Sequence, residues 1–478
     1  MISFLLDQQL VHIENADSNL TVLEWLREHR QLTGTKEGCA SGDCGACTVT
    51  LAEVVENELQ YRSINSCITL LSALNGKQLI TVEHLQDNAI LHPVQQAMVD
   101  EHGAQCGFCT PGFVMSMFTL YQQRTDNAET ELSRGQIDNA LSGNLCRCTG
   151  YRPIIDAAKK ACNKPKTDKF SKVSDATVAK LCSIASTKPG IENLHMPRTS
   201  QELASILQTH PKARIVAGST DLALEITQAL RPIETLVSLG ELAELKTIAE
   251  TDTPLTIGAA ATFSDIEPFL LKHFPDTKEW LHRFASVPIR NQATMGGNIA
   301  NASPIGDSAP LLIALGAQLI LTNGSNQRSV PVEDYFVDYK QTQLAAGEWL
   351  ARIDIPSPDR ACFLRAYKVS KRMEDDISAV CAVFNLKLEE GDIAELKAGF
   401  GGVAAIPKSI PELSQFVGRP WSIATINEIE ALLHDYFAPI SDVRASANYR
   451  NDIVANLWRR FSIETTQPEI PVRVVEHA

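Results

Sequence analysis

Four cysteines in the first part of the chain have a spacing that suits an iron–sulfur cluster. Cys39, Cys44 and Cys47 follow the pattern C-x4-C-x2-C, and Cys67 completes the set found in plant-type [2Fe-2S] clusters. Glycines in this loop let the chain wrap closely enough for backbone amides to reach the cluster sulfurs. Zinc or buried free thiols are the alternative, but the complete spacing favours the cluster.

A second group consists of Cys106 and Cys109, in a C-x2-C pattern, and Cys146 and Cys148 further along the chain. Taken alone, these four thiolates could equally hold tetrahedral zinc. Beside an iron–sulfur loop a second [2Fe-2S] cluster is favoured, because one-electron carriers work in chains. The remaining cysteines lack such spacing and are interpreted as non-ligand thiols: Cys162, Cys182, Cys362 and Cys381.

Two glycine-containing segments could approach a dinucleotide. In 214–222 a β-prone run leads into a glycine turn and a helical pattern, so several amides could point at a pyrophosphate. In 296–307, small residues allow close backbone approach, and Asn and Asp side chains could recognise hydroxyls. A third segment, 399–404, formally fits G-x-G-x-x-A, but Pro407 follows too closely for a full helix. We therefore reject the third segment.

The elements that position these residues change along the chain. Before residue 85 the pattern is strand-rich, with strands expected at 4–6, 11–13, 49–55 and 79–82 and one helix at 21–29. Residues 91–160 have helical spacing, and 163–180 are polar enough for an exposed linker. Short strands and helices then alternate to 356. The last part predicts a strand pair, 380–388 and 395–400, and helices at 426–437 and 445–461.

Composition excludes several classes of partner. A formal net charge of −14 argues against nucleic acid, because such binding needs Lys and Arg to neutralise phosphates. No segment approaches the roughly 18 apolar residues of a membrane span. The first ten residues fit a β-strand better than a signal peptide. So many cysteines suit the reducing cytosol, and we expect a cytoplasmic protein that binds neither membrane nor nucleic acid.

Three motifs closely resemble signatures of the xanthine oxidase family of molybdenum hydroxylases. They are the segments 38–47, 105–112 and 143–153, with the sequences GCASGDCGAC, QCGFCTPG and GNLCRCTGYRP. The resemblance covers essentially the whole chain and implies a multidomain α+β protein.

The resemblance implies five parts. They are a β-grasp, plant-type ferredoxin-like [2Fe-2S] domain (1–84), a helical-bundle [2Fe-2S] domain (85–162), a linker (163–190), an α+β FAD-binding domain of the vanillyl-alcohol-oxidase/CO-dehydrogenase-flavoprotein type (191–358) and a C-terminal α+β flavoprotein domain (359–478). In this family the helical-domain cluster lies next to molybdopterin, toward which the residue matching Gln105 reaches. The plant-type cluster would then lie between the helical-domain cluster and the flavin.

The family's FAD contacts carry over by position. They are Arg214, Ile215, Val216, Ala217, Gly218, Ser219, Thr220, Asp221, Leu222, Phe284, Ala285, Thr294, Gly297, Asn298, Asn301, Gly306, Asp307, Leu350 and Lys368.

The segment 368–377 resembles the family segment beside the flavin ring. It places Ile377 against the isoalloxazine and Asp375 near the nicotinamide, and Tyr339 matches an aromatic residue of the same pocket. Met373 departs from a second arginine that mammalian relatives use in switching between NAD and oxygen, so such switching is in doubt. Gly306 replaces a serine and removes one hydroxyl that could contact the cofactor.

The resemblance implies an electron-transfer subunit. The family's molybdopterin domain is too long to fit in this chain, so we expect a separate large subunit and a heterotetramer with two copies of each. Electrons would pass through both clusters to FAD and then to NAD+. Because clusters and flavin are fused in one chain, as in xanthine dehydrogenases, we expect the partner to hydroxylate xanthine or hypoxanthine to urate.

Two alternatives remain at this point. The partner could act on an aldehyde or another nitrogen heterocycle while the role of this chain stays the same. The chain could also be a zinc-stabilised assembly protein without redox function, although all eight candidate ligand cysteines are present.

Overall fold

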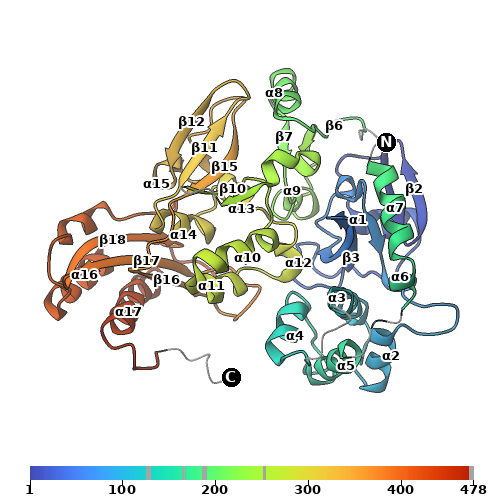
Figure 1. Ribbon diagram of the computed structural model, residues 1–478, viewed down its shortest axis with the longest axis horizontal. Coiled ribbons are helices and arrows are strands. Elements are labelled where there is room, and N and C mark those ends of the chain that lie inside the picture. The colour runs from blue at the N-terminus through green and yellow to red at the C-terminus, as the bar shows by residue number, and fades with distance from the viewer. Residues whose placement is uncertain (125–130, 164–165, 167, 186–190, 251–253, 473–478) are drawn as a thin grey trace. The chain divides into compact units, whose positions relative to one another are not determined.

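The computed structural model describes residues 1–124, 131–163, 166, 168–185, 191–250 and 254–472, which form an α+β structure (Figure 1). The chain divides into two compact units. The first comprises 1–243 with 285–293, and the second comprises 244–284 with 294–478.

The first unit begins with a mixed sheet in the strand order β2-β1-β5-β3-β4. Its strands are β1 (Ile2–Leu6), β2 (Gln9–Ile13), β3 (Thr48–Val55), β4 (Glu58–Asn65) and β5 (Gln78–Ile80). β1 and β5 pair in parallel, whereas the other pairs are antiparallel. Helix α1 (Val22–Glu24) continues as a π-helical turn to His29, and Trp25 packs edge-to-face on Phe4 at 5.2 Å.

The four expected strands and the expected helix are confirmed, but β4 was not predicted. Burial in this strand begins only at Tyr61. The charged and polar residues Glu58, Gln60 and Arg62 therefore hide the alternation of apolar and polar residues by which a strand is predicted.

A helical bundle follows the sheet. Its helices are α2 (Pro93–Asp100), α3 (Thr110–Gln123), α4 (Arg134–Leu141) and α5 (Arg152–Cys162). Helix α3 is apolar nearly all round, because other helices and strands β3 and β4 surround it. At the edge of the bundle, His92 and Asp168 form a buried pair 2.9 Å apart, which the side-chain amide of Gln122 also joins.

The expected linker at 163–190 is wrong for most of its described residues. They form α6 (Lys169–Lys172) and α7 (Ser174–Ala185). Phe170 packs on Phe118 at 4.9 Å, and Leu181 and Ile184 are buried with Leu5. The apolar stripe is sparse and lies among Lys, Ser and Asp residues, so composition alone hides it. Residues 164–165, 167 and 186–190 of this call lie outside the described residues.

A small parallel sheet completes the first unit. Its strands are β6 (Leu194–His195), β8 (Leu236–Ser238) and β7 (Arg214–Val216), in that order, and its helices are α8 (Ser200–Thr209) and α9 (Ala223–Thr227). Its buried residues share one core with β1 and α1. The segment 285–293 contributes the short helix α12 (Val287–Arg290).

The second unit contains an antiparallel sheet in the order β12-β11-β15-β10-β9. Its strands are β9 (Ile248–Glu250), β10 (Leu255–Gly258), β11 (Gln318–Thr322), β12 (Gln327–Pro331) and β15 (Trp349–Ile355), with a hairpin of β13 (Phe336–Asp338) and β14 (Gln341–Thr342). Its helices are α10 (Phe263–His273), α11 (Lys278–His282), α13 (Met295–Ala300), α14 (Ser308–Ala314) and α15 (Val332–Tyr335).

The last part of the second unit is a three-stranded antiparallel sheet covered on both faces (Figure 1). Its elements are β16 (Cys362–Val369), β17 (Val380–Glu389), β18 (Asp392–Gly401), α16 (Ile423–Tyr436) and α17 (Ala447–Thr466), which confirm the predicted strand pair and helices.

Residues of β17 alternate between the two faces of this sheet. Phe384 packs with Trp458 of α17, whereas Cys381 and Asn385 contact the backbone of 307–314, the start and length of α14. Gly399 belongs to β18, and a Cβ there would lie 2.1 Å from the Pro310 carbonyl. The segment 399–404 thus begins as a strand against α14.

No helix in the described ranges is long and apolar enough to cross a membrane.

Candidate cluster and flavin sites

The four cysteines of the first group come together at one end of the first sheet. Cys47 and Cys67 are buried, with their sulfurs 3.3 Å apart, while Cys39 and Cys44 are half-buried in the preceding loop. The amides of Ser41 and Cys44 both donate to the Cys39 sulfur at 3.4 Å. Hydrogen bonds from Cys44 and then Cys67 lower the pKa of Cys39, which favours the thiolate that binds metal.

The second group lies at the ends of helices in the bundle and is more exposed. Cys109 immediately precedes α3, and Cys146 and Cys148 precede α5, with Cys106 and Cys148 exposed. The Thr149 hydroxyl lies 3.1 Å from the Cys146 sulfur, and the Thr149 amide donates to it at 3.4 Å. Burial raises the pKa of Cys146, but these hydrogen bonds outweigh it and the pKa is lowered.

The thiols within each group hydrogen-bond to one another. Cys39 interacts with both Cys44 and Cys67, and Cys47 interacts with Cys67. In the second group Cys106 interacts with Cys148 and Cys109 with Cys146. Among the described residues, no three His, Cys, Asp or Glu side chains surround a single point as one metal ion would require. Four thiolates brought together are the donor set that the two irons of a [2Fe-2S] cluster need, so the residues of each group fit this cluster.

The loops that carry the two groups are joined by hydrogen bonds. The Leu145 amide, next to Cys146, donates to the Cys44 carbonyl at 3.0 Å, and the Asn144 side chain donates to the Gly45 carbonyl at 3.1 Å. Helix α3 begins against the same loop, where a Cβ on Gly112 would lie 2.1 Å from the Gly45 carbonyl. Only glycine allows so close an approach, which the sequence patterns did not indicate.

The first expected flavin segment, 214–222, packs against the loops of the first cysteine group. Ser219, which follows β7 and has φ +60°, donates its hydroxyl to the Ile68 carbonyl at 2.6 Å. The Gln228 side chain, at the end of α9, donates to the Cys39 carbonyl at 3.0 Å.

Gly218 in the same segment is required by packing. A Cβ there would lie 1.8 Å from the Gln292 carbonyl. Arg214, expected at the flavin, forms an exposed ion pair with Glu225 at 2.7 Å.

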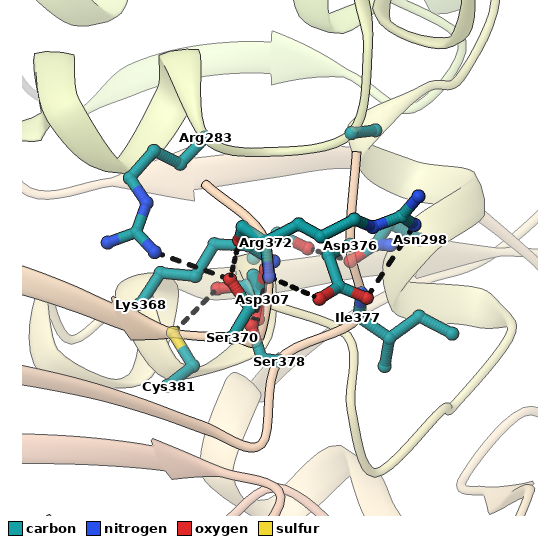
Figure 2. Close-up of polar contacts among 12 residues, drawn as sticks. Arg283, Asn298, Asp307, Lys368, Ser370, Arg372, Asp376, Ile377, Ser378 and Cys381 are labelled. Atoms are coloured by element: carbon teal, nitrogen blue, oxygen red, sulfur yellow. Dashed lines mark hydrogen bonds and ion pairs between the residues drawn. The ribbon is translucent and has the colours of Figure 1, made fainter. Parts of the chain in front are cut away.

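The second expected flavin segment is built around a buried ion pair in the second unit, shown in Figure 2. Lys368 of β16 donates to Asp307 at 2.7 Å, and both side chains are less than 5% exposed. Ser378 bonds to both, at 2.7 Å to Asp307 and 2.9 Å to Lys368, so neither charge is left without a partner. Asn298 of α13 accepts a hydrogen bond from Ser308. Sequence reasoning named Asp307, Lys368 and Asn298 but not Ser378.

The loop 370–378, which carries Asp375 and Ile377, is held by its own charged residues. The Arg372 amide donates to Asp376 at 2.8 Å, and the Arg372 guanidinium donates to the Asp375 carbonyl at 2.7 Å. Arg283, after α11, donates to the Met373 carbonyl at 3.1 Å. It also donates to the Ser370 hydroxyl at 3.3 Å (Figure 2). Sequence reasoning missed Arg283, because nothing local links positions so far apart.

The other expected contacts occupy varied environments. Phe284 is buried against Phe263 at 4.2 Å, and Leu350 is buried within β15. Thr294 caps α13 by accepting from the Gly297 amide at 2.9 Å, and Asn301 ends that helix.

The two further predicted FAD contacts are Ala285 and Gly306. Ala285 has φ +51° and falls in the first unit, whereas Phe284 falls in the second. A side chain at Gly306 would begin 3.2 Å from the Asn298 side-chain oxygen, so this position has little room.

Gln105 is exposed beside Cys106. Tyr339 follows β13 with 57% of its surface exposed, while Asp375 and Ile377 lie in the 370–378 loop. Gln105, Tyr339 and the loop with Asp375 and Ile377 are three separate segments of the chain, and the roles of these residues stay predictions.

Four family descriptions match the chain in order. They are a 2Fe-2S iron-sulfur cluster binding domain (4–72), a [2Fe-2S] binding domain (81–159), the FAD binding domain in molybdopterin dehydrogenase (189–358) and the CO dehydrogenase flavoprotein C-terminal domain (365–465). Together they match both cysteine groups and both expected flavin segments.

Relatives of known name agree with these descriptions. Xanthine dehydrogenase of Emericella nidulans is 32% identical over 96% of this chain, and xanthine dehydrogenase/oxidase of Mus musculus is 32% identical over 97%. The chain spans only 38% and 39% of the length of these two relatives.

Solved structures match a smaller part of the chain. One chain of a reconstituted CO dehydrogenase from Oligotropha carboxidovorans is 29% identical with a TM-score of 0.54, and the match covers 57% of this chain and 97% of that one. One chain of quinoline 2-oxidoreductase from Pseudomonas putida 86 is 26% identical with a TM-score of 0.53, covering 59% and 99%.

The chain belongs to the molybdenum hydroxylases of the xanthine dehydrogenase and CO dehydrogenase family, of which it carries the iron–sulfur and flavin part as a subunit or as the N-terminal part of a longer protein. Two [2Fe-2S] binding domains and an FAD-binding domain make up that part.

Proposed function

We propose that this chain is the electron-transfer subunit of a xanthine dehydrogenase. It receives electrons from a molybdopterin-binding partner subunit that hydroxylates xanthine or hypoxanthine, and delivers them to NAD+. The observation that carries the proposal is the direct packing of the two cysteine loops on each other and of segment 214–222 on the first loop. Such packing gives electrons a short covalent and hydrogen-bonded route.

The cysteines of each group would hold one cluster. Cys39, Cys44, Cys47 and Cys67 serve the first, and Cys106, Cys109, Cys146 and Cys148 serve the second. When bound, the clusters carry single electrons, and FAD converts these to the two-electron exchange that NAD+ requires. Amides of Ser41, Cys44 and Thr149 hydrogen-bond to ligand sulfurs and thereby adjust the reduction potentials.

The exposed second group is proposed to face the partner, and Gln105 to reach its pterin. The FAD contacts proposed are those expected from the sequence, with Asp307 and Lys368 forming a buried ion pair among them. Asp375, Ile377 and Tyr339 are proposed to form the nicotinamide pocket. Arg283 and Arg372 hydrogen-bond to backbone carbonyls of the loop that carries Asp375 and Ile377. This loop therefore presents a fixed surface to a dinucleotide.

Two findings support xanthine as the substrate of the partner. Both named xanthine dehydrogenases align over nearly the whole chain, through the cluster and flavin regions together. By contrast, the matched CO dehydrogenase chain is almost fully covered by little more than half of this chain. We propose a heterotetramer of two small and two large subunits located in the cytoplasm.

A second candidate substrate is a nitrogen heterocycle other than a purine. It is favoured by the match to quinoline 2-oxidoreductase at 26% identity. In that case every residue role given above for this chain stays the same, and only the partner subunit differs.

The test is to express this chain with its molybdopterin-binding partner and record the visible spectrum anaerobically. We expect flavin and iron–sulfur absorbance that bleaches with xanthine and recovers with NAD+. Bleaching with quinoline or an aldehyde but not with xanthine would replace the substrate. A colourless, zinc-containing protein would refute electron transfer altogether.

A further inference from the structure

A pocket of about 330 Å³ opens where strands β16 and β17 meet the start of α17. It lies beyond the last residue of β16 and beside Ala379, at one base of the 370–378 loop. Its walls come from this loop and from the segment 444–449. All of the lining residues belong to the second unit, and none of them is among the proposed cofactor contacts, although Asp375 and Ile377 lie in the same loop.

Among the residues that the structure describes, two cationic side chains line this pocket and no carboxylate does. Lys371 donates one hydrogen bond to the Val443 carbonyl at 2.7 Å, which fixes its ammonium group and leaves two further N–H groups. Arg444 lies 3.7 Å from Asp442, the nearest acid. Asp442 also forms an ion pair with the buried Arg450 at 2.7 Å, so Arg450 largely neutralises its charge.

Neutral groups complete the lining. Ser370 and Ser446 belong to the lining. The Ser370 hydroxyl donates to the Arg372 carbonyl at 2.7 Å, and Ser446 caps α17 by accepting from the Tyr449 amide at 3.2 Å. The positive end of this 20-residue helix therefore adds to the field of the two cations. Tyr449 keeps 45% of its surface exposed, and Val443 beside the pocket keeps 84% exposed. An aromatic face and an apolar group next to fixed cations are suited to a base and a phosphate.

A second surface pocket provides a comparison. It lies between α16 and α17, measures about 370 Å³ and is lined by Glu430 and Asp435 as well as Arg459 and His434. Arg459 is already paired with Glu430, so this pocket has no excess of positive charge. The positive character of the first pocket is therefore not a general feature of this sheet and its helices.

We propose that the pocket at Lys371 and Arg444 binds the phosphate end of a nucleotide, with the base beside Tyr449. The phosphate could belong to the acceptor dinucleotide or to a separate mononucleotide. Both share the chemistry that the lining recognises, and the site itself does not depend on the proposed electron transfer.

The test measures binding of ADP, inorganic phosphate and NADH to the full chain by calorimetry. No substrate of the molybdopterin-binding partner is present. The variants are Lys371→Ala and Arg444→Ala. Loss of one charge-assisted contact to phosphate is expected to weaken ADP binding at least about 10-fold, equivalent to about 1.4 kcal/mol. Arg360→Ala removes an exposed positive charge from the loop before β16 and should leave binding unchanged.

Competition separates the two sources. If NADH displaces ADP and both variants weaken NADH as well, the phosphate belongs to the acceptor. If ADP binds and is weakened by the variants while NADH does not compete, the pocket holds a separate mononucleotide. The proposal is overturned if wild-type protein with an unaltered unfolding temperature binds neither ADP nor phosphate at millimolar concentration, or if both variants bind ADP as wild type does. Normal reduction of the flavin by NADH in that case would leave the proposed function standing.

Discussion

The two cysteine groups have the same donors but very different surroundings. The first is enclosed at the end of a sheet, with two of its four cysteines buried and backbone amides donating to Cys39. The second lies at helix ends, with two of its four cysteines exposed and a side-chain hydroxyl, from Thr149, at its sulfur. The same four-thiol chemistry can therefore serve a structural core in one case and an accessible surface in the other.

The largest expected effect follows from replacing one ligand cysteine in each group. Cys67→Ser should eliminate the first cluster and lower the free energy of unfolding by roughly 3 kcal/mol more than Cys148→Ser, because metal binding in a buried site contributes to folding. Cys67 is 3% exposed, whereas Cys148 is exposed. Iron content and urea midpoints measure the two effects. Equal midpoints in the two variants would contradict the distinction.

The second largest effect concerns the hydrogen bonds that connect the loops of the two cysteine groups. Asn144 donates to Gly45 and Thr48 and accepts from Ser116 at 2.6 Å, all in buried positions. Asn144→Ala leaves these groups without partners and should cost about 2 kcal/mol, with slower electron exchange between clusters. Asp138→Ala, which removes only an exposed ion pair on α4, is the control and should cost under about 0.5 kcal/mol. Freeze-quench EPR of both clusters follows the exchange.

The helical region also has its own dependence on pH. Burial raises the pKa of Asp168, but hydrogen bonds from His92 and Ser171 outweigh it and hold the pKa below its usual value. The stability from this carboxylate is therefore complete above about pH 4, the ordinary Asp pKa, and is lost as pH falls through the lower folded value. Asp168→Asn should lose roughly 1–2 kcal/mol at neutral pH. Its deficit relative to wild type should shrink below pH 4 in urea titrations; a constant deficit would refute this.

The smallest effect should appear at Thr149. Thr149→Val removes a hydroxyl 3.1 Å from the Cys146 sulfur, while Thr149→Ser keeps it. A hydrogen bond to sulfur stabilises the reduced, more negative cluster, so the valine variant should have a potential lower by about 20–40 mV, equivalent to roughly 0.5–1 kcal/mol. The hydrogen bonds to the Cys39 sulfur in the first group come from backbone amides, so a side-chain substitution does not remove them. An unchanged potential in redox titrations would show that this bond has no influence.

Much of the architecture could be predicted because its signals are local. Cysteine spacing fixes which residues can share a cluster, and period-2 or helical patterns located most strands and helices. The failures have physical causes. Strand β4 and helices α6 and α7 have their buried residues diluted by charged and polar ones. Gly218 was assigned to cofactor approach, whereas its packing on the Gln292 backbone already requires glycine. Contacts such as Ser219 to Ile68 or Arg283 to Met373 join distant positions, and one sequence contains no record of them.

The alternation along β17 has a consequence for how this sequence can evolve. Odd positions such as Cys381 and Asn385 face the helix that begins at the Asp307 pair, while even positions such as Phe384 face the aromatic core with Trp458. An insertion or deletion of one residue within this strand would exchange the two sets and place Phe384 against the backbone of α14, where Cys381 and Asn385 now make their contacts. Length changes among homologues should therefore gather in the 370–378 loop and in the turn at 390–391, and β17 itself should keep a constant length.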